Sequence, residues 1–126
     1  MELEDLHAVV SCLPAAAAEA LERSVRATVL HVDVDEAPVL DAIARDLGLG
    51  EPGGTWNWDA ISDLLWQRLH GGGDALLVLA RADDLAARRL QELIDATGAL
   101  RDLSRTLQPV RLWSVLAGEG PAFGVE

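Results

Sequence analysis

The sequence predicts a two-layer α/β domain in which helices cover one face of a three-stranded parallel sheet. Predicted strands and helices alternate along the chain, and parallel pairing needs such helical crossovers. With 126 residues, 50% of them apolar, the chain can bury one core but is too short for two. We expect an N-terminal helical extension at 1–27, the main domain at 28–117 and a loose C-terminal tail at 118–126.

Residues 1–25 are predicted to form two short helices. Pro14 suits the first turn of the second helix. The first helix is indicated by apolar residues at helical spacing, namely Leu3, Leu6, Val9, Val10 and Leu13. Exposed apolar stripes usually mark a contact, so this segment should either cover the open sheet face or form a self-association surface.

Three segments have the features of strands. Residues 28–34 are β-branched and alternate in polarity, 75–80 form a short apolar run between turn signals, and 110–117 follow a proline. In the first of these, His31 and Asp33 occupy the face opposite to their apolar neighbours. This mixed face predicts that one side of the sheet is partly solvated.

The remaining segments have helical periodicity. Residues 36–47 form an amphipathic pattern that ends at Gly48. Residues 57–69 follow, with Asn57 as a favourable N-cap. A long helical stretch at 83–108 is expected to divide near Thr97 and Gly98.

Composition excludes several chemistries. A single cysteine, Cys12, rules out an internal disulfide framework and a four-cysteine zinc site. All ten formal cations are arginine, so any phosphate-binding or Schiff-base lysine is absent. We expect no cofactor. No apolar run approaches the roughly 20 residues of a membrane span, and the acidic start lacks the basic region of a signal peptide. The sequence therefore predicts a cytoplasmic protein.

The charge indicates the kind of partner. Ten arginines against 21 acids give a net charge of −11, the wrong sign for nucleic acid or anionic membranes. The acids are concentrated in residues 28–66, where eight face one arginine. The sequence therefore predicts a basic protein partner, and it leaves the oligomeric state open.

Two patterns suggest other chemistry. His31, Asp33 and Asp35 alternate on one strand face and could ligate a metal, although a solvated face paired with Arg111 is the simpler interpretation. Asp59 and Asp63, one helical turn apart, could serve a hydrolase, but the segment around them offers no supporting nucleophile or metal cluster. We therefore expect no catalytic or metal-ligating residue and no enzyme activity.

The helix at 57–69 has an unusual outward face. An acidic and aromatic stripe is formed by Asp59, Ser62, Asp63, Trp66 and His70. Asp59 suits the first turn, whereas Asp63 has no such structural reason and should repel it. Trp66 could pack onto the core, as helical tryptophans more often do, or form an interface hot spot for a basic partner.

The run Asn57-Trp58-Asp59-Ala60-Ile61-Ser62-Asp63-Leu64-Leu65 resembles the signature helix of the barstar family, small intracellular inhibitors of bacterial ribonucleases. The resemblance covers about residues 28–117 and implies a barstar-like fold. It assigns Asp59 and Asp63 as the inhibitory acids, the second at the position of a substrate phosphate.

The resemblance also implies an interface aromatic before this helix and an acid late in the last helix. Gly53 and Gly54 occupy the aromatic position, so Trp56 is the expected substitute, and Asp102 is the late acid. The predicted partner-binding set is Asp59, Asp63, Trp56, Ser62, Trp66 and Asp102. The implied function is an immunity protein against a secreted barnase-like ribonuclease; the alternative is a regulatory or adaptor module that binds another basic protein.

Overall fold

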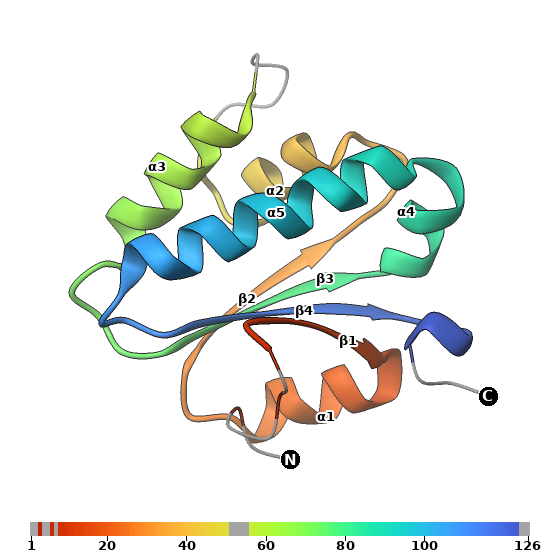
Figure 1. Ribbon diagram of the computed structural model, residues 1–126, viewed down its shortest axis with the longest axis horizontal. Helices are drawn as coiled ribbons and strands as arrows, with labels where there is room; N and C mark the ends of the chain where they lie inside the picture. Colours follow the sequence, from red (N-terminus) through yellow and green to blue (C-terminus); the bar gives the residue numbers. More distant parts are fainter. Residues whose placement is uncertain (1–2, 4–5, 7, 51–55, 124–126) are drawn as a thin grey trace.

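The computed structural model describes residues 3, 6, 8–50 and 56–123. It contains a four-stranded parallel sheet in the order β1-β4-β3-β2 (Figure 1). The strands are β1 (Val10–Pro14), β2 (Thr28–Asp33), β3 (Ala75–Ala80) and β4 (Leu112–Gly118). The helices are α1 (Ala15–Ser24), α2 (Val39–Asp46), α3 (Trp58–Leu69), α4 (Ala82–Arg88), α5 (Leu90–Leu107) and the 3-10 helix η2 (Pro121–Phe123).

The three predicted strands and the α/β class are confirmed, but the sheet has a fourth strand. Residues 10–14, predicted to end one helix and begin the next, form β1 and pair with β4 from Val10 opposite Ser114 to Pro14 opposite Gly118. The apolar spacing does not distinguish a helix from a strand here, because this short strand has apolar residues on both of its faces. Val10 joins one core cluster and Leu13 packs against the other.

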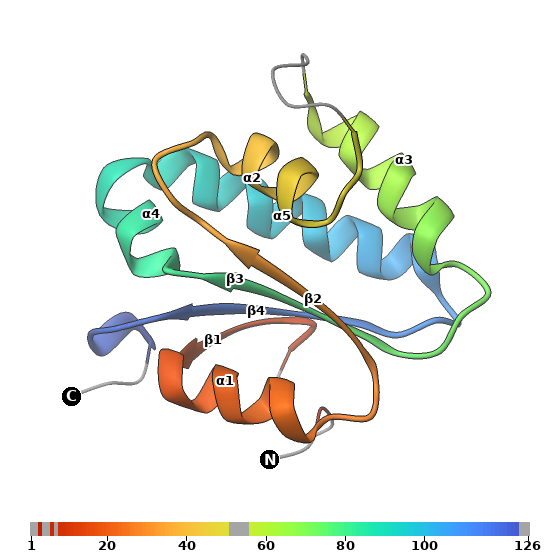
Figure 2. The same cartoon turned by 180° about the vertical axis from the view of Figure 1, so that it is seen from behind.

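The sheet is covered on both faces, which corrects the two-layer prediction. Helix α1 lies on the face opposite to α2, α3 and α5 (Figures 1 and 2). Between α1 and the sheet lies a second core cluster of Leu3, Ala18, Leu21, Leu76, Val78, Trp113, Val115 and Ala117. The N-terminal apolar residues therefore cover the sheet. Exposed polar side chains persist on the edge strand β2, at His31 and Asp33.

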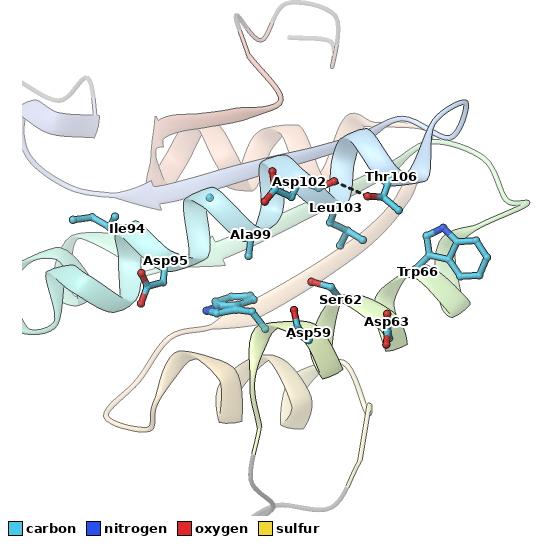
Figure 3. Close-up of a pocket in the computed structure, with 12 residues that line it drawn as sticks. Asp59, Ser62, Asp63, Trp66, Ile94, Asp95, Ala99, Asp102, Leu103 and Thr106 are labelled. Atoms are coloured by element: carbon cyan, nitrogen blue, oxygen red, sulfur yellow. Dashed lines mark hydrogen bonds between the residues drawn. The ribbon is translucent and has the colours of Figure 1, made fainter.

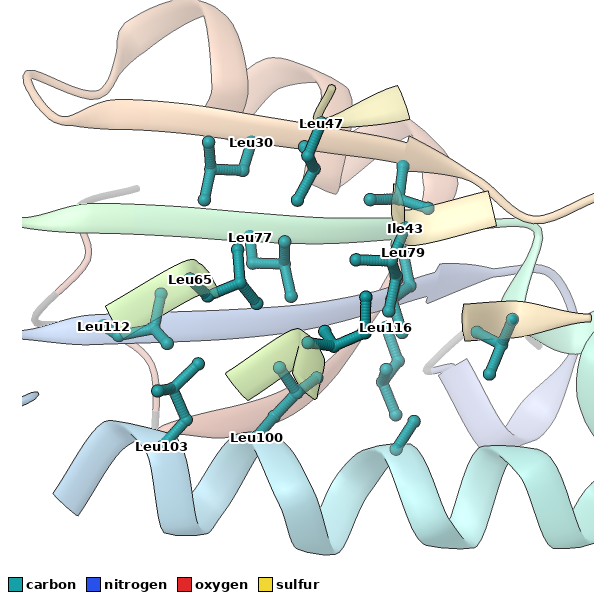
Figure 4. Close-up of a cluster of buried hydrophobic side chains, with 14 of the residues drawn as sticks. Leu30, Ile43, Leu47, Leu65, Leu77, Leu79, Leu100, Leu103, Leu112 and Leu116 are labelled. Carbon is teal, nitrogen blue, oxygen red and sulfur yellow. The ribbon is translucent and has the colours of Figure 1, made fainter. Parts of the chain in front are cut away.

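The larger core lies between the sheet and the other helices (Figure 4). Leu77, Leu79 and Leu112 of the strands face Leu65 of α3 and Leu100 of α5, and all five are nearly inaccessible to solvent. Burying such side chains contributes about 1.5–3 kcal/mol each. This packing fixes α3 and α5 relative to each other.

Two boundaries differ from the predictions. The long helical stretch divides at Arg89, whose backbone is not helical, and not near Thr97 and Gly98, which lie inside α5. The chain after Ala117 is not loose through Phe123, because Phe123 is buried in the larger core. Among the described helices, none has the length and apolar character needed to cross a membrane.

Candidate functional site

Helices α3 and α5 pack against each other and border a surface cleft of about 640 Å³ (Figure 3). Five of the six predicted partner-binding residues line it, namely Asp59, Ser62, Asp63, Trp66 and Asp102. The other lining residues are Trp58, Ile94, Asp95, Gly98, Ala99, Leu103 and Thr106. The fold thus brings together residues of two helices that are separated in the sequence by β3 and α4.

The local sequence explains the orientation of α3. The Asn57 side chain accepts a hydrogen bond from the Ala60 amide at 2.8 Å and caps the helix. Ile61, Leu65 and Leu69 are buried against the sheet. Because these three share one face, the acidic residues of α3 must lie on the solvent side.

The cleft has an uncompensated negative charge. Asp59 and Asp63 are exposed, and neither forms a hydrogen bond or ion pair within the part of the chain that the structure describes. Asp102 meets Arg105 at 3.5 Å, but both side chains are about three-quarters exposed, and such pairs contribute little. Among the residues lining the cleft, none is cationic. Its carboxylates are therefore available to cations from outside.

Trp66 is exposed and is not part of the buried core, while its place in an interface stays a prediction. Its side chain has 39% of its surface accessible and stacks on His70, with ring centroids 4.1 Å apart. The His70 ring nitrogen Nδ1 lies 2.8 Å from the Trp66 carbonyl oxygen. One face of the exposed indole is therefore covered by the His70 ring.

Trp56 lies outside the cleft. Its ring packs partly buried against the larger core and so close to Gly50 that an added Cβ there would come within 2.8 Å of it. Its indole nitrogen is buried without a hydrogen-bond partner among the described residues. The structure therefore gives Trp56 a packing role, and its place in an interface stays a prediction. Gly53 and Gly54 lie outside the described residues.

Sequence reasoning missed Asp95, the fourth carboxylate of the cleft. Asp95 accepts a hydrogen bond from Gln91 at 2.9 Å and lies on α5 two turns before Asp102. The signal was present in the spacing, because two acids seven positions apart with Gly98 and Ala99 between them share one helix face. The predicted division near Thr97 and Gly98 would place the two acids in separate segments, and only the packing of α5 against α3 brings Asp95 to the cleft.

The alternating residues His31 and Asp33 of β2 and Asp35, which follows the strand, do not form a common site. His31 Nδ1 lies 2.6 Å from Glu22, Asp33 pairs with Arg81 at 2.9 Å, and Asp35 pairs with Arg45 at 2.7 Å. The expected pairing with Arg111 is wrong, because Arg111 binds Asp74 at 2.8 Å. Within the described ranges, no group of three or more His, Cys, Asp or Glu residues could hold a metal ion.

Arg45 organises the outer edge of β2. It donates to Asp35, to Asp46 and to the Asp33 carbonyl oxygen, while the Asp33 amide donates to Asp46 at 2.7 Å. The Ala37 amide and the Arg45 side chain hold the pKa of Asp35 below its usual value, and Arg45 chiefly lowers the pKa of Asp46. Side chains thus occupy backbone groups that an edge strand would otherwise expose.

The fold and the cleft together define a small α/β domain with an acidic surface site built on two helices. A family model described as Barstar (barnase inhibitor) matches residues 27–117. The chain belongs to the barstar family, a family of inhibitors rather than enzymes. The matched range agrees with the predicted resemblance over about 28–117. Searches of curated proteins and of solved structures each found no match.

Proposed function

We propose that the protein inhibits a secreted, barnase-like ribonuclease by placing the acidic face of α3 in the enzyme's basic active site. The observation that supports this most is the cleft lined by Asp59, Asp63, Asp95 and Asp102 and by no cation. Asp59 and Asp63 have no partner within the described residues, and two like charges one helical turn apart destabilise an isolated helix slightly, so a cationic partner would reverse this effect. Family membership supplies the class of partner.

The mechanism is occupancy without covalent chemistry. Ribonuclease active sites present cationic side chains to the phosphates of RNA, and carboxylates can accept the same charge-assisted hydrogen bonds. Asp63 lies in the middle of α3 and has no structural duty, so it is the main acceptor. Asp59 lies in the first turn, where the helix dipole already stabilises its charge. Ser62 lies between them along the cleft and offers a neutral hydroxyl.

Long-range electrostatics would accelerate this association. The chain carries a formal net charge of −11, and residues 28–66, which include most of α3, hold eight of its acids. Such a field concentrates a basic protein near the cleft and raises the association rate at low ionic strength. In the cytoplasm of the producing cell, rapid capture would protect RNA before the ribonuclease is exported.

A regulatory or adaptor role is the second candidate. The same acidic cleft would suit any basic protein surface, because nothing in its charge alone specifies a nuclease. Such a protein would bind its partner without inhibiting RNA cleavage. The two candidates therefore differ in one observable, the catalytic activity of the bound partner.

The test combines capture with an activity assay. The protein is immobilised, basic proteins are captured from the native host, and each is assayed for RNA cleavage with and without the inhibitor. A panel of purified barnase-type ribonucleases is assayed in parallel. We expect stoichiometric inhibition of at least one ribonuclease. Capture of a basic protein with no inhibited ribonuclease would contradict the inhibitor function and support the adaptor.

A further inference from the structure

Gly98 lies in the middle of the 18-residue helix α5 without an evident packing reason. Glycine inside a helix is less favourable than alanine, so its presence there raises the question of a packing or functional reason. Here the backbone is helical, the residue is exposed, and an added Cβ would meet no other atom within 4 Å. The described part of the chain therefore does not require glycine at this position.

Gly98 connects two depressions. It lines the acidic cleft on one side of α5, and it also lines a groove of about 470 Å³ on the other side. Ile94, one turn earlier, is the second residue shared by both. Apart from Arg101 and Thr97, the groove is lined by weakly polar or apolar residues of α5, β1 and β4, namely Val10, Cys12, Leu93 and Leu116.

The ridge between the two depressions is apolar and exposed. Ile94 leaves 54% of its surface accessible, and Leu90, one turn before it, leaves 55%. At Gly98 the ridge has no side chain, which creates a low point between the cleft and the groove. A chain segment from another molecule could cross α5 there without a steric clash.

We propose that a segment of the basic ribonuclease crosses α5 at Gly98, so that a cationic side chain binds in the cleft and a neighbouring apolar side chain enters the groove beside Cys12. The inference rests on the proposed function and extends its binding site to β1 and β4. The partner is thereby specified as a protein in which a basic residue and an exposed apolar residue are adjacent.

Charge favours this partner over a second copy of the chain. Two copies joined along α5 would bring their clefts together, each with four carboxylates. Like charges facing each other at such an interface oppose association. Arg101 at the groove disfavours a cation there, so the basic group belongs in the cleft and the apolar group in the groove.

Two substitutions test the path without removing any acid. Gly98→Leu fills the low point and should raise the melting temperature, because leucine favours the helix and the space is open. Cys12→Trp fills the groove away from the cleft. Each should weaken inhibition of a ribonuclease identified as a target about tenfold or more, as expected for an interface centre. The matched controls, Ala20→Leu and Ala20→Trp, add the same side chains at an exposed position of α1 and should leave inhibition unchanged.

Cys12 also gives a direct readout of occupancy, because it is the single cysteine of the chain and it is exposed. Burial raises the pKa of its thiol, so alkylation with iodoacetamide is followed at alkaline pH. Saturating ribonuclease should slow this alkylation severalfold in the unmodified protein.

The outcomes separate the two proposals. The groove path would be overturned if Gly98→Leu and Cys12→Trp inhibit normally and Cys12 of the unmodified protein is equally reactive with and without ribonuclease. The inhibitor function would then still stand. Weaker inhibition by both variants at an unchanged or higher melting temperature, together with protection of Cys12, supports the path. Absence of inhibition by the unmodified protein across the whole panel would overturn the function and the path that rests on it.

Discussion

Trp66 lies flat on His70, with the two ring planes only 3° apart and the centroids separated by 4.1 Å. The two residues are one turn apart at the end of α3, and the His70 ring also contacts the Trp66 carbonyl oxygen. The stack covers one face of an exposed tryptophan that lines the acidic cleft, and we expect it to restrict the indole. A side chain that is already ordered loses less conformational entropy on binding.

Replacing Trp66 should therefore affect binding far more than folding. We expect Trp66→Ala to weaken inhibition by about 2 kcal/mol, roughly 30-fold, because exposed tryptophans are frequent interface anchors. His70→Ala should weaken inhibition less, because it removes the stacking partner of Trp66 but leaves the indole side chain in place. Inhibition constants and melting temperatures of both variants check this. Unchanged inhibition by Trp66→Ala would remove the residue from the interface.

Association should depend strongly on salt. We expect the association rate to fall steeply as the ionic strength rises to about 0.15 M, where the screening length shrinks to about 8 Å, while dissociation changes much less. Charge reversal at Asp41, outside the cleft, should slow association and leave the lifetime nearly unchanged. Stopped-flow measurements at several salt concentrations check both rates. Salt-insensitive association would contradict electrostatic steering.

The sequence predicted the acidic stripe of α3 well because its residues obey one period. Once Ile61 and Leu65 face the core, the helical period places Asp59, Asp63 and Trp66 toward solvent. The buried residues therefore predict which residues are exposed. Asp95 could not be assigned in the same way. Its relation to α3 depends on how two helices pack, which no local pattern specifies.

The second sheet face shows the same limit. His31 and Asp33 suggested a solvated face, yet Leu76 and Val78 of the neighbouring strand are buried on that side. A strand that is apolar on both faces needs cover on both, and this requirement should have predicted the third layer. The polar residues His31 and Asp33 indicated only that β2 is an edge strand. At this edge Arg45 and Asp46 bind the backbone of Asp33.

The Arg45 network should contribute to stability in a defined pH range. The folded pKa values of Asp35 and Asp46 lie below the ordinary value of 3.8, so the contribution is complete above that pH and is lost as the pH falls through the lowered values. We expect the melting temperature of Arg45→Gln to fall less steeply than that of the unmodified protein as the pH is lowered into the acidic range, the acid limb of the curve. The control Arg23→Gln removes an exposed pair with Glu19 and should leave that limb unchanged. Parallel acid limbs for Arg45→Gln and the unmodified protein would contradict this role.

The N-terminal layer should support folding and not inhibition. Leu21 is 1% exposed beneath the sheet, on the face opposite to the cleft. We expect Leu21→Ala to lower the free energy of unfolding by about 2–5 kcal/mol, the usual effect of a buried leucine deletion. At a temperature where the variant stays folded, its inhibition constant should match that of the unmodified protein. Weaker inhibition by the folded variant would connect α1 to the site.

The inhibition constant of Asp63→Ala tests the central claim most directly. Asp59→Ala and Asp84→Ala remove one negative charge each, the former in the cleft and the latter at an exposed site of α4. We expect Asp63→Ala to weaken inhibition of the identified ribonuclease about 100-fold, Asp59→Ala less, and Asp84→Ala within about threefold. All three should melt close to the unmodified protein. Equal inhibition constants for Asp63→Ala and Asp84→Ala would contradict the acidic cleft as the inhibitory site.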